Sequence, residues 1–305
     1  MLHDVVIVGG GPAGLSAALA FGRSRRHVLV CDGAPRRNAA AEQVHNFVTR
    51  DGTPPDDFRR IAREQLAAYP SVEVRDVAVE AIAGTTGAFR VAAGAETVAA
   101  RRVLLCTGMV DETLPLEGFR ELWGHAIFQC PYCHGWEVRD RRWGYLAREE
   151  DLEKLLPFAL KLRAWTADVT VFTDRGFDIG AERRGRLAAA GIEVPTAPVR
   201  RLLGGERRLE GVELADGARV PCEVLFAHPP QRQVPLVESL ALALEGGPYV
   251  RVDPLTRETS TRGIYAAGDL TARAQAAIFA AAAGTLAATA INVDLALEVP
   301  APLEA

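Results

Sequence analysis

Short runs of apolar residues alternate with amphipathic stretches along most of the 305-residue chain. The runs at residues 5–8, 28–31 and 103–106 are rich in Val, Leu and Ile, and an apolar helix-like stretch follows the first of them. Unbroken apolar runs of this length are typical of strands that are buried on both faces of a parallel sheet. The pattern therefore predicts an α/β fold whose parallel strands are covered by helices.

The other elements of the first 115 residues follow different patterns. Residues 33–57 are irregular, and long irregular connections in a compact domain are often functional. Residues 57–69 predict an amphipathic helix, because apolar side chains recur there near helical spacing. Short strands are expected at residues 72–82, 88–93 and 96–100, and this succession favours a β-meander.

Prolines and glycines around residues 115–124 precede a second α/β segment. In this segment the apolar pattern predicts strands at residues 143–147 and 169–172 and a helix between them. The remaining elements expected there are a helix over 182–190, a strand over 192–194, and short strands near 199–203, 209–214 and 219–227.

The first domain is expected to resume near Pro248, because the pattern of a buried strand returns at residues 263–269 and an alanine-rich helix follows from Gln275. The chain is long enough for two ordinary domains. The sequence thus predicts one discontinuous domain of residues 1–115 and 248–305, and an inserted domain of residues 116–247.

Gly9, Gly11 and Gly14 form a G-x-G-x-x-G motif at the junction of the first strand and helix. Glycines at these positions allow a tight turn, let the backbone approach a pyrophosphate, and permit close helix–strand packing. The helix N-terminus then stabilises the phosphate charge. Asp32 ends the second strand 18 residues after Gly14, where a carboxylate accepts hydrogen bonds from an adenosine ribose. A dinucleotide site is predicted; a purely structural glycine turn is the alternative.

The chain is organised around the segment Cys130-Pro131-Tyr132-Cys133-His134-Gly135-Trp136-Glu137. Two cysteines at this spacing can form a reversible disulfide across one turn. The adjacent His134 could accept a thiol proton near neutral pH, because an imidazole has an ordinary pKa of ~6.5. Alternatively, His134 is an exposed turn residue without a catalytic role. Glu137 is either a second acid–base group or a solvated surface charge. Trp136 and Trp143 are expected to pack rather than to stack on a substrate.

The other cysteines, Cys31, Cys106 and Cys222, lie in apolar strand-like runs and are expected to pack as small hydrophobic side chains. No second CxxC and no nearby histidine pair completes a four-ligand zinc site, so no metal is expected. A structural or metal-binding role for Cys130 and Cys133 is the alternative to redox chemistry.

Composition and charge exclude several classes of protein. With 49% hydrophobic residues the chain is an ordinary globular protein, and its net charge of −4 argues against a general nucleic-acid binder. The most apolar long segment, residues 276–291, falls short of the ~20 residues that a membrane span needs, so we expect a buried or interfacial helix and no membrane. The N-terminus lacks the basic start of a signal peptide, and a cytoplasmic protein is expected.

The second α/β segment lacks the residues that bind a nicotinamide nucleotide. Where a glycine motif is needed after its first strand, residues 147–151 read Ala-Arg-Glu-Glu-Asp. Bulky side chains there would block the backbone, and each carboxylate would repel a phosphate by ~1 kcal/mol in water and ~4 kcal/mol near a protein surface. After the next strand, residues 173–176 read Thr-Asp-Arg-Gly in place of clustered arginines. NADPH is therefore a doubtful cofactor.

The order of these motifs along nearly the whole chain resembles the low-molecular-weight thioredoxin reductase family, within the FAD-dependent pyridine nucleotide-disulfide oxidoreductases. The resemblance implies two Rossmann-like three-layer α/β domains, an FAD domain with a β-meander and an inserted, degenerate NAD(P)-type domain that carries the CxxC. It also implies a homodimer. The residues that carry it are the glycine motif, Asp32, Asn46, Cys106-Thr107-Gly108, the CxxC pair, Ala267-Gly268-Asp269 and Gln275-Ala276.

FAD is the cofactor that this resemblance implies, with Cys133 facing the flavin and Cys130 exchanging with the substrate. Asp269 would meet the ribityl–phosphate side, and the helix that starts near Gln275 would meet the isoalloxazine ring. The FAD-contacting residues implied by the resemblance are Gly9, Gly11, Pro12, Ala13, Gly14, Asp32, Asn46, Thr107, Gly108, Asp269, Gln275 and Ala276, together with Asn38 and Val77.

The redox segment departs from typical members of the family, which carry an acid where this chain has His134. The run at residues 130–137 looks closer to a subgroup that includes fungal dithiol oxidases of epidithio natural-product pathways and their bacterial relatives, and so do residues 45–47 and 50–55. Some thioredoxin-reductase-like flavoproteins lack a working pyridine-nucleotide site and take electrons elsewhere, including from ferredoxin.

Three hypotheses follow. The first is an FAD-dependent dithiol/disulfide oxidoreductase that does not use NADPH well. Its substrate is a thioredoxin-like protein or a small-molecule dithiol, and its outer electron partner is oxygen, ferredoxin or another carrier. The second is an NADPH–thioredoxin reductase with a divergent nucleotide loop. The third is a flavin-binding protein whose second domain has become a sensing or interaction module, with the CxxC as a redox switch.

Overall fold

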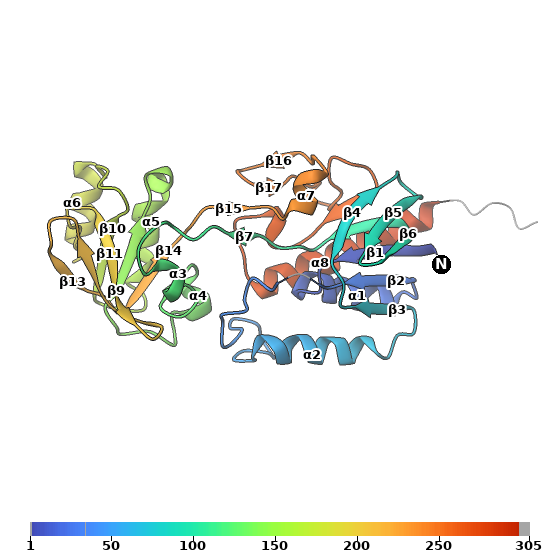
Figure 1. Ribbon diagram of the computed structural model, residues 1–305, viewed down its shortest axis with the longest axis horizontal. Helices are drawn as coiled ribbons and strands as arrows, with labels where there is room; N and C mark the ends of the chain where they lie inside the picture. The colour runs from blue at the N-terminus through green and yellow to red at the C-terminus, as the bar shows by residue number, and fades with distance from the viewer. Residues whose placement is uncertain (1, 34, 299–305) are drawn as a thin grey trace, which may run out of the picture. The chain divides into compact units, whose positions relative to one another are not determined.

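The computed structural model describes residues 2–33 and 35–298 and divides into two compact units (Figure 1). Unit 1 consists of Met1–Val110 and Gln231–Ala305, and unit 2 is the intervening Asp111–Pro230. The chain crosses between them twice. The crossing segments pair as a two-stranded sheet of β7 (Val110–Asp111) and β15 (Gln231–Arg232).

Unit 1 is built on one large sheet. Four parallel strands lie in the order β3-β2-β1-β6, and the antiparallel β5 and β4 extend the sheet beyond β6. A further parallel strand, β18, pairs with the second half of β6. The bounds are β1 (Leu2–Val8), β2 (Val28–Cys31), β3 (Val72–Arg75), β4 (Val79–Ala83), β5 (Phe89–Ala93), β6 (Glu96–Leu105) and β18 (Ile264–Ala266).

The predicted meander is present as β4-β5-β6, but its last strand is longer than expected. The runs at 96–100 and 103–106 belong to the single ten-residue β6, because its first half pairs with β5 while its second half continues between β1 and β18. The single strand expected over 72–82 is two strands, β3 and β4, which lie at opposite ends of the sheet order.

Alternate residues of the central strands face two different cores, as the period of a strand requires. Val5 and Ile7 of β1 pack with helices α1 (Pro12–Arg23) and α8 (Ala277–Leu297). Val6 and Val8 face the other core, to which the meander and the short elements after residue 231 contribute. Unit 1 therefore has the three layers that the sequence predicts. Its remaining elements are α2 (Pro55–Leu66), α7 (Pro235–Ser239), β16 (Leu244–Glu245), β17 (Tyr249–Val250) and the 3-10 turn η2 (Asp269–Thr271).

Helix α8 lies along α1, and glycine makes the close approach possible (Figure 1). A Cβ atom on Gly284 would collide with the carbonyl oxygen of Ala13. At 21 residues α8 is longer than the expected 276–291, and by length and composition alone it could cross a membrane. Its buried residues, including Ala287 and Ile291, belong to the core beneath α1, so this face of α8 packs as a core helix.

Unit 2 is a smaller three-layer unit. Its four-stranded parallel sheet has the order β10-β9-β14-β8, and a separate antiparallel sheet has the order β11-β12-β13. Alternate residues of β9 and β14 face the helices on one side and the antiparallel sheet on the other. The bounds are α3 (Phe119–Leu122), β8 (Ile127–Phe128), α4 (Pro131–His134), β9 (Trp143–Ala147), η1 (Glu149–Asp151), α5 (Leu152–Leu162), β10 (Val169–Thr173), α6 (Ala181–Ala189), β11 (Val199–Gly205), β12 (Arg208–Leu214), β13 (Arg219–Pro221) and β14 (Val224–Ala227).

Two details of unit 2 differ from the pattern-based expectation. Residues 192–194 make only an isolated bridge, between Thr170 and Glu193, because the parallel sheet ends at β10. The strand expected over 219–227 is divided between two sheets, since β13 pairs with β12 and β14 with β9.

The unit boundaries also differ from those expected at 115/116 and 247/248. The division falls at Val110/Asp111 and Pro230/Gln231. Leu236, Val237 and Leu242, which the sequence places in the inserted domain, are buried in the meander-side core of unit 1. Pro248, at which the first domain was expected to resume, thus lies within a segment that already belongs to unit 1.

We predict that Gly284→Ala destabilises the protein by about 1–3 kcal/mol, because the added methyl group has to push α8 away from α1. Gly185→Ala is the matched control, since Gly185 also lies inside a helix but has open space around its built Cβ. It should stabilise α6 by about 0.5–1 kcal/mol through helix propensity. Scanning calorimetry of both variants is the measurement, and equal shifts in Tm would contradict the packing argument.

Candidate active site

Cys130 and Cys133 form a disulfide, with their Cα atoms 5.3 Å apart. Cys130 is the extended residue before the one-turn helix α4, and Pro131 occupies the first helical position, where its missing N–H costs nothing. The Cys133 amide donates to the Cys130 carbonyl at 3.1 Å, which closes the turn. Both cysteines are partly exposed. The sequence prediction of a disulfide across one turn is confirmed.

His134 ends α4 and is half-buried, so the alternative of an exposed turn residue is wrong. Its ring stacks on Phe128 with centroids 4.4 Å apart and an interplanar angle of 14°. Phe128 belongs to β8 and is itself buried. The imidazole next to Cys133 is therefore held in one orientation by a strand of the parallel sheet.

Aromatic side chains surround the redox segment. Tyr132 makes an edge contact with Trp165, and the Lys161 ammonium lies 5.5 Å from the Tyr132 ring centroid. Burial lowers the pKa of Lys161. Trp143 is buried, as predicted, and its indole donates to a backbone carbonyl. Trp136 is exposed instead, and the Arg139 guanidinium stacks over it at 4.0 Å. The prediction that both tryptophans pack is thus confirmed for Trp143 and wrong for Trp136.

The three other cysteines are buried and reduced. Burial raises the pKa of Cys31 to about 11 and that of Cys222 to about 12, and it raises the pKa of Cys106 as well. A thiol with a raised pKa carries little of the nucleophilic thiolate. These cysteines therefore pack as small hydrophobic side chains, as predicted. The described residues hold no cluster of three or more His, Cys, Asp or Glu side chains that could bind a metal ion.

The glycine motif forms the turn between β1 and α1. A Cβ on Gly14 would collide with the Gly9 carbonyl oxygen, and one on Gly9 with the Cys106 carbonyl oxygen. A Cβ on Gly11, in contrast, would meet nothing within 4 Å. Gly9 and Gly14 are thus required by packing, whereas Gly11 borders open space, as a residue that lets a pyrophosphate approach the backbone should.

Thr107 and Gly108 follow Cys106, the first residue after β6, whose carbonyl lies against Gly9 of this turn. The Thr107 hydroxyl oxygen is buried and has no hydrogen-bond partner among the described residues. A Cβ on Gly108, whose φ is +66°, would meet nothing within 4 Å. A buried polar atom without a partner is costly unless a ligand or water completes it. This observation and the open space at Gly11 fit a bound dinucleotide.

Asp32 directly follows β2, and its side chain is only 7% exposed. Two arginines of α2, Arg59 and Arg63, contact the same carboxylate oxygen, Oδ2, the second of them at 2.8 Å. Among the described residues no arginine contacts Oδ1, which leaves that oxygen for a ribose hydroxyl. The sequence predicted Asp32 but not its arginine partners, which come from a helix more than 25 residues further along the chain.

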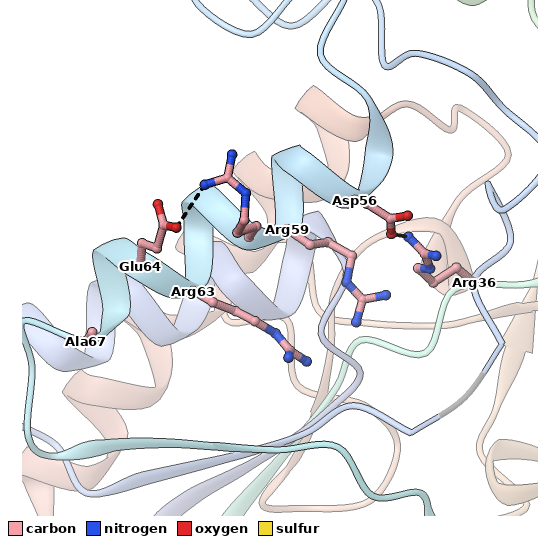
Figure 2. Close-up of a pocket in the computed structure, with 7 residues that line it drawn as sticks. Arg36, Asp56, Arg59, Arg63, Glu64 and Ala67 are labelled. Carbon is pink, nitrogen blue, oxygen red and sulfur yellow. Dashed lines mark hydrogen bonds and ion pairs between the residues drawn. The ribbon is translucent and has the colours of Figure 1, made fainter.

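An open cavity of about 650 Å³ lies against this cluster (Figure 2). Figure 2 shows Arg59 and Arg63 extending from the same side of α2, and Arg36 paired with Asp56 at the start of the helix. Because Arg59 and Arg63 both line the cavity and contact Asp32, the cavity adjoins the predicted ribose site. Its lining consists of Arg36, Asp56, Arg59, Arg60, Arg63, Glu64 and Ala67.

Asp269 and Gln275 are brought together by a residue that the sequence analysis missed. Arg37 donates to Asp269 Oδ2 at 2.9 Å and to Gln275 Oε1 at 2.7 Å. Gly268 lies against Ala13, since a built Cβ there would be 3.1 Å from the Ala13 Cβ. The C-terminal site residues thus join the glycine turn in unit 1. Arg37 lies in the irregular segment 33–57, whose length was the only signal that it is functional.

The remaining predicted FAD-contacting residues make fewer contacts with the glycine turn and with Asp269. Val77 lies beside Gly33, the residue after Asp32, and Asn38 follows Arg37. Asn46 is exposed with φ +59°, and its backbone N–H donates to Asp51 Oδ1 at 2.7 Å. Pro12 begins α1, and Ala276 precedes α8, which starts at Ala277, two residues after Gln275 and thus near it, as predicted. All predicted FAD-contacting residues belong to unit 1, whereas Cys130, Cys133 and His134 belong to unit 2.

The end of β9 carries carboxylates in unit 2. Glu149, Glu150 and Asp151 form the 3-10 turn that leads into α5. Arg148 pairs with Glu150 at 2.9 Å, so its charge is already balanced. After the neighbouring β10, burial raises the pKa of Asp174, and Arg148 is one of two arginines that oppose this rise. The positions where a nucleotide phosphate would lie in an NAD(P) domain are thus occupied by acidic side chains.

The chain is similar in sequence and fold to known proteins. The sequence model of the family "Pyridine nucleotide-disulphide oxidoreductase" matches residues 3–152. A thioredoxin reductase of Claviceps purpurea, tcpT, is 32% identical over 96% of this chain and 95% of its own length. The chain belongs to the thioredoxin-reductase-like family of FAD-dependent pyridine nucleotide-disulfide oxidoreductases. It therefore acts on disulfides, and its cofactor is FAD.

Two further comparisons agree with this membership. A thioredoxin reductase of Aspergillus oryzae, aclD, is 31% identical over 97% of this chain and 98% of its own length. The crystal structure of an oxidoreductase from Agrobacterium tumefaciens matches with a TM-score of 0.90 and 35% identity, covering 98% of this chain and all of the other. The predicted two-domain Rossmann-type architecture is thereby confirmed.

Gly11 allows a test that separates FAD binding from folding. We predict that Gly11→Val leaves the thermal stability of the FAD-free protein within about 0.5 kcal/mol, because the new side chain points into open space. It should nevertheless weaken FAD binding by at least about 100-fold, because the side chain blocks the pyrophosphate. Flavin fluorescence titration and thermal melts of the apoprotein are the measurements.

Gly14→Ala is the matched control, since its added methyl group would collide with the Gly9 carbonyl oxygen and should lower the stability of the apoprotein itself. Unimpaired FAD binding by Gly11→Val would place the pyrophosphate elsewhere.

Proposed function

We propose that this FAD-dependent oxidoreductase passes two electrons between a dithiol substrate and the flavin through Cys130 and Cys133, and that it does not use NADPH efficiently. The observation that carries the proposal is the turn Glu149–Asp151 at the end of β9, where a nicotinamide nucleotide would need glycines. Oxygen, ferredoxin or another carrier would then be the outer electron partner. The cytoplasmic location expected from the sequence is part of the proposal.

The sulfur chemistry balances within the CxxC pair. A substrate thiolate attacks Cys130 Sγ, the bond between Cys130 and Cys133 breaks, and Cys133 leaves as a thiolate. The second substrate thiol then attacks the mixed disulfide, so that the substrate leaves as a disulfide and both cysteines hold the electron pair as thiols. Bound FAD supplies the acceptor for this pair, and an outer carrier removes it.

Under this proposal His134 handles the protons of these steps. It follows Cys133 directly, and stacking on Phe128 restricts its ring. Each exchange step requires a thiolate, so a base beside the pair increases the reactive fraction near neutral pH. In this proposal the imidazole of His134 accepts the proton. Typical family members have a carboxylate at the position of His134.

An NADPH-dependent thioredoxin reductase is the second candidate function, because relatives carry that description. The Arabidopsis thaliana protein that is named NADPH-dependent thioredoxin reductase 3 is 27% identical over 94% of this chain and 57% of its own length. Under this alternative the carboxylates at the end of β9 would have to move away from the phosphates, or their charge would have to be balanced by bound cations.

A reductant screen by anaerobic stopped flow tests the proposal. We predict that a small dithiol or reduced ferredoxin bleaches the bound flavin rapidly, whereas NADPH and NADH do so much more slowly. Cys133→Ser should slow bleaching by the dithiol about 10³-fold or more, because the covalent route is lost. Cys31→Ala is the control, since Cys31 is a buried cysteine of unit 1 that forms no disulfide, and its removal should leave the rate unchanged.

Rapid bleaching by NADPH, followed by turnover with thioredoxin, would establish the second candidate instead. If Cys133→Ser abolishes a cellular signal while no substrate supports multiple turnovers, the pair acts as a redox switch and the enzymatic proposal is wrong.

The same proposal includes a homodimer that uses α8. Phe279, Leu286 and Val293 are spaced by seven residues, so they share one face of α8, and each is more than half exposed. A continuous apolar stripe of this kind marks an interaction surface. A second copy is the occupant that the family resemblance favours.

We predict that Leu286→Lys converts the dimer to a monomer, because it places a charge in the centre of the apolar stripe. Leu255→Lys is the control, since Leu255 is 84% exposed on a loop outside α8. Sedimentation velocity of the FAD-loaded variants gives the oligomeric state. A wild-type monomer, or a wild-type protein that binds lipid vesicles through α8, would contradict the dimer.

A further inference from the structure

The side-chain amide of Gln275 is fully engaged with protein atoms. Its Oε1 accepts from Arg37 Nη1 at 2.7 Å and from Gln231 Nε2 at 3.0 Å. Its Nε2 lies within hydrogen-bond distance of Gln231 Oε1 and of the carbonyl oxygens of Asp269 and Ala272. The amide therefore fastens the segment from Asp269 to Ala276, from which FAD contacts are predicted, instead of extending away from it.

The donors and acceptors around the Gln275 amide determine which of its atoms is the oxygen and which the nitrogen. Arg37 is only a donor, so the Gln275 atom that faces it must be the oxygen. The nitrogen of Gln275 then faces Gln231 Oε1, and Gln231 returns a donor to Gln275 Oε1. Tyr249 completes the chain, because its hydroxyl donates to Gln231 Oε1 at 3.0 Å. Each amide orientation is thus fixed by its neighbours.

Gln231 holds a particular place in the chain. It is the first residue of unit 1 after the second crossing, and it begins β15. Two residues later the buried Gln233 donates from Nε2 to the carbonyl oxygens of Pro248 and Leu270, at 2.6 and 3.0 Å. The crossing segment is therefore hydrogen-bonded to residues 269–276 at two points. Gln231 bonds to Gln275, and Gln233 bonds to the Leu270 carbonyl.

We infer that Gln231 is a positioning residue for the flavin site: through the Gln275 amide it fixes the segment that leads into α8, with Tyr249 as its support. The inference rests on the FAD-binding part of the proposed function and not on the identity of the electron partner. Without the Gln231 side chain, Gln275 loses a donor and an acceptor at once. The backbone around Ala276 then becomes less ordered, and the bound flavin experiences a different environment.

Four variants test the inference in the FAD-loaded protein. Gln231→Leu should weaken FAD binding about 3- to 10-fold, the effect of one or two lost hydrogen bonds, and should shift the visible absorption bands and the midpoint potential of the bound flavin. Tyr249→Phe should shift them in the same direction by less. Gln65→Leu and Tyr69→Phe are the matched controls, because Gln65 is exposed on α2 and the Tyr69 hydroxyl accepts a hydrogen bond from the exposed Arg23.

A double-mutant cycle shows whether Gln231 acts through Gln275. If it does, Gln231→Leu combined with Gln275→Leu should affect flavin affinity and spectrum no more than Gln275→Leu alone. Additive effects would overturn the inference, and so would a Gln231→Leu protein with lowered Tm but an unchanged flavin spectrum and affinity. Rapid reduction by NADPH would contradict the proposed function and leave this inference intact, whereas a wild-type protein that does not bind FAD would contradict both.

Discussion

The close approach of three backbone segments is the constraint on which unit 1 depends. The carbonyl of Gly9 lies where a Cβ of Gly14 would be, and the carbonyl of Cys106 lies where a Cβ of Gly9 would be. The β1–α1 turn can therefore pack against the end of β6 only because residues 9 and 14 are glycine, and α8 can reach α1 only because residue 284 is glycine. Segments from both ends of the chain thereby meet around Ala13, where the dinucleotide site is predicted.

The arrangement also explains why the insertion between the two halves is tolerated. The segments up to Val110 and from Gln231 share one sheet and two cores, so their association does not depend on what lies between them in the sequence. The two crossings occur at β7 and β15, two short strands that pair with each other. The crossing segment is not a passive linker, because Gln231 and Gln233 bond to the loop that carries Asp269.

Local pattern was sufficient to predict the elements and the residues that a motif names. The strand Val28–Cys31 and the strand Trp143–Ala147 have the predicted bounds, since each is an apolar run that ends at a polar residue. The partners of those residues could not be predicted. Arg59, Arg37 and Gln231 reach the site from separate parts of the chain, and only the tertiary fold brings them to Asp32, Asp269 and Gln275. The length of β6 was missed for the same reason, because different neighbours pair with its two halves.

Unit 2 keeps a three-layer α/β fold although the turn between β9 and α5 carries carboxylates instead of glycines. Its stability comes from the two cores on either side of β9 and β14, and neither core includes the turn Glu149–Asp151. Substitutions in that turn therefore cost little folding free energy, because they alter a surface loop rather than packing. The redox segment is different, since Phe128 of the core holds His134 and Gly135 lies against Trp165. The packing of unit 2 thus constrains the redox segment more tightly than the turn that follows β9.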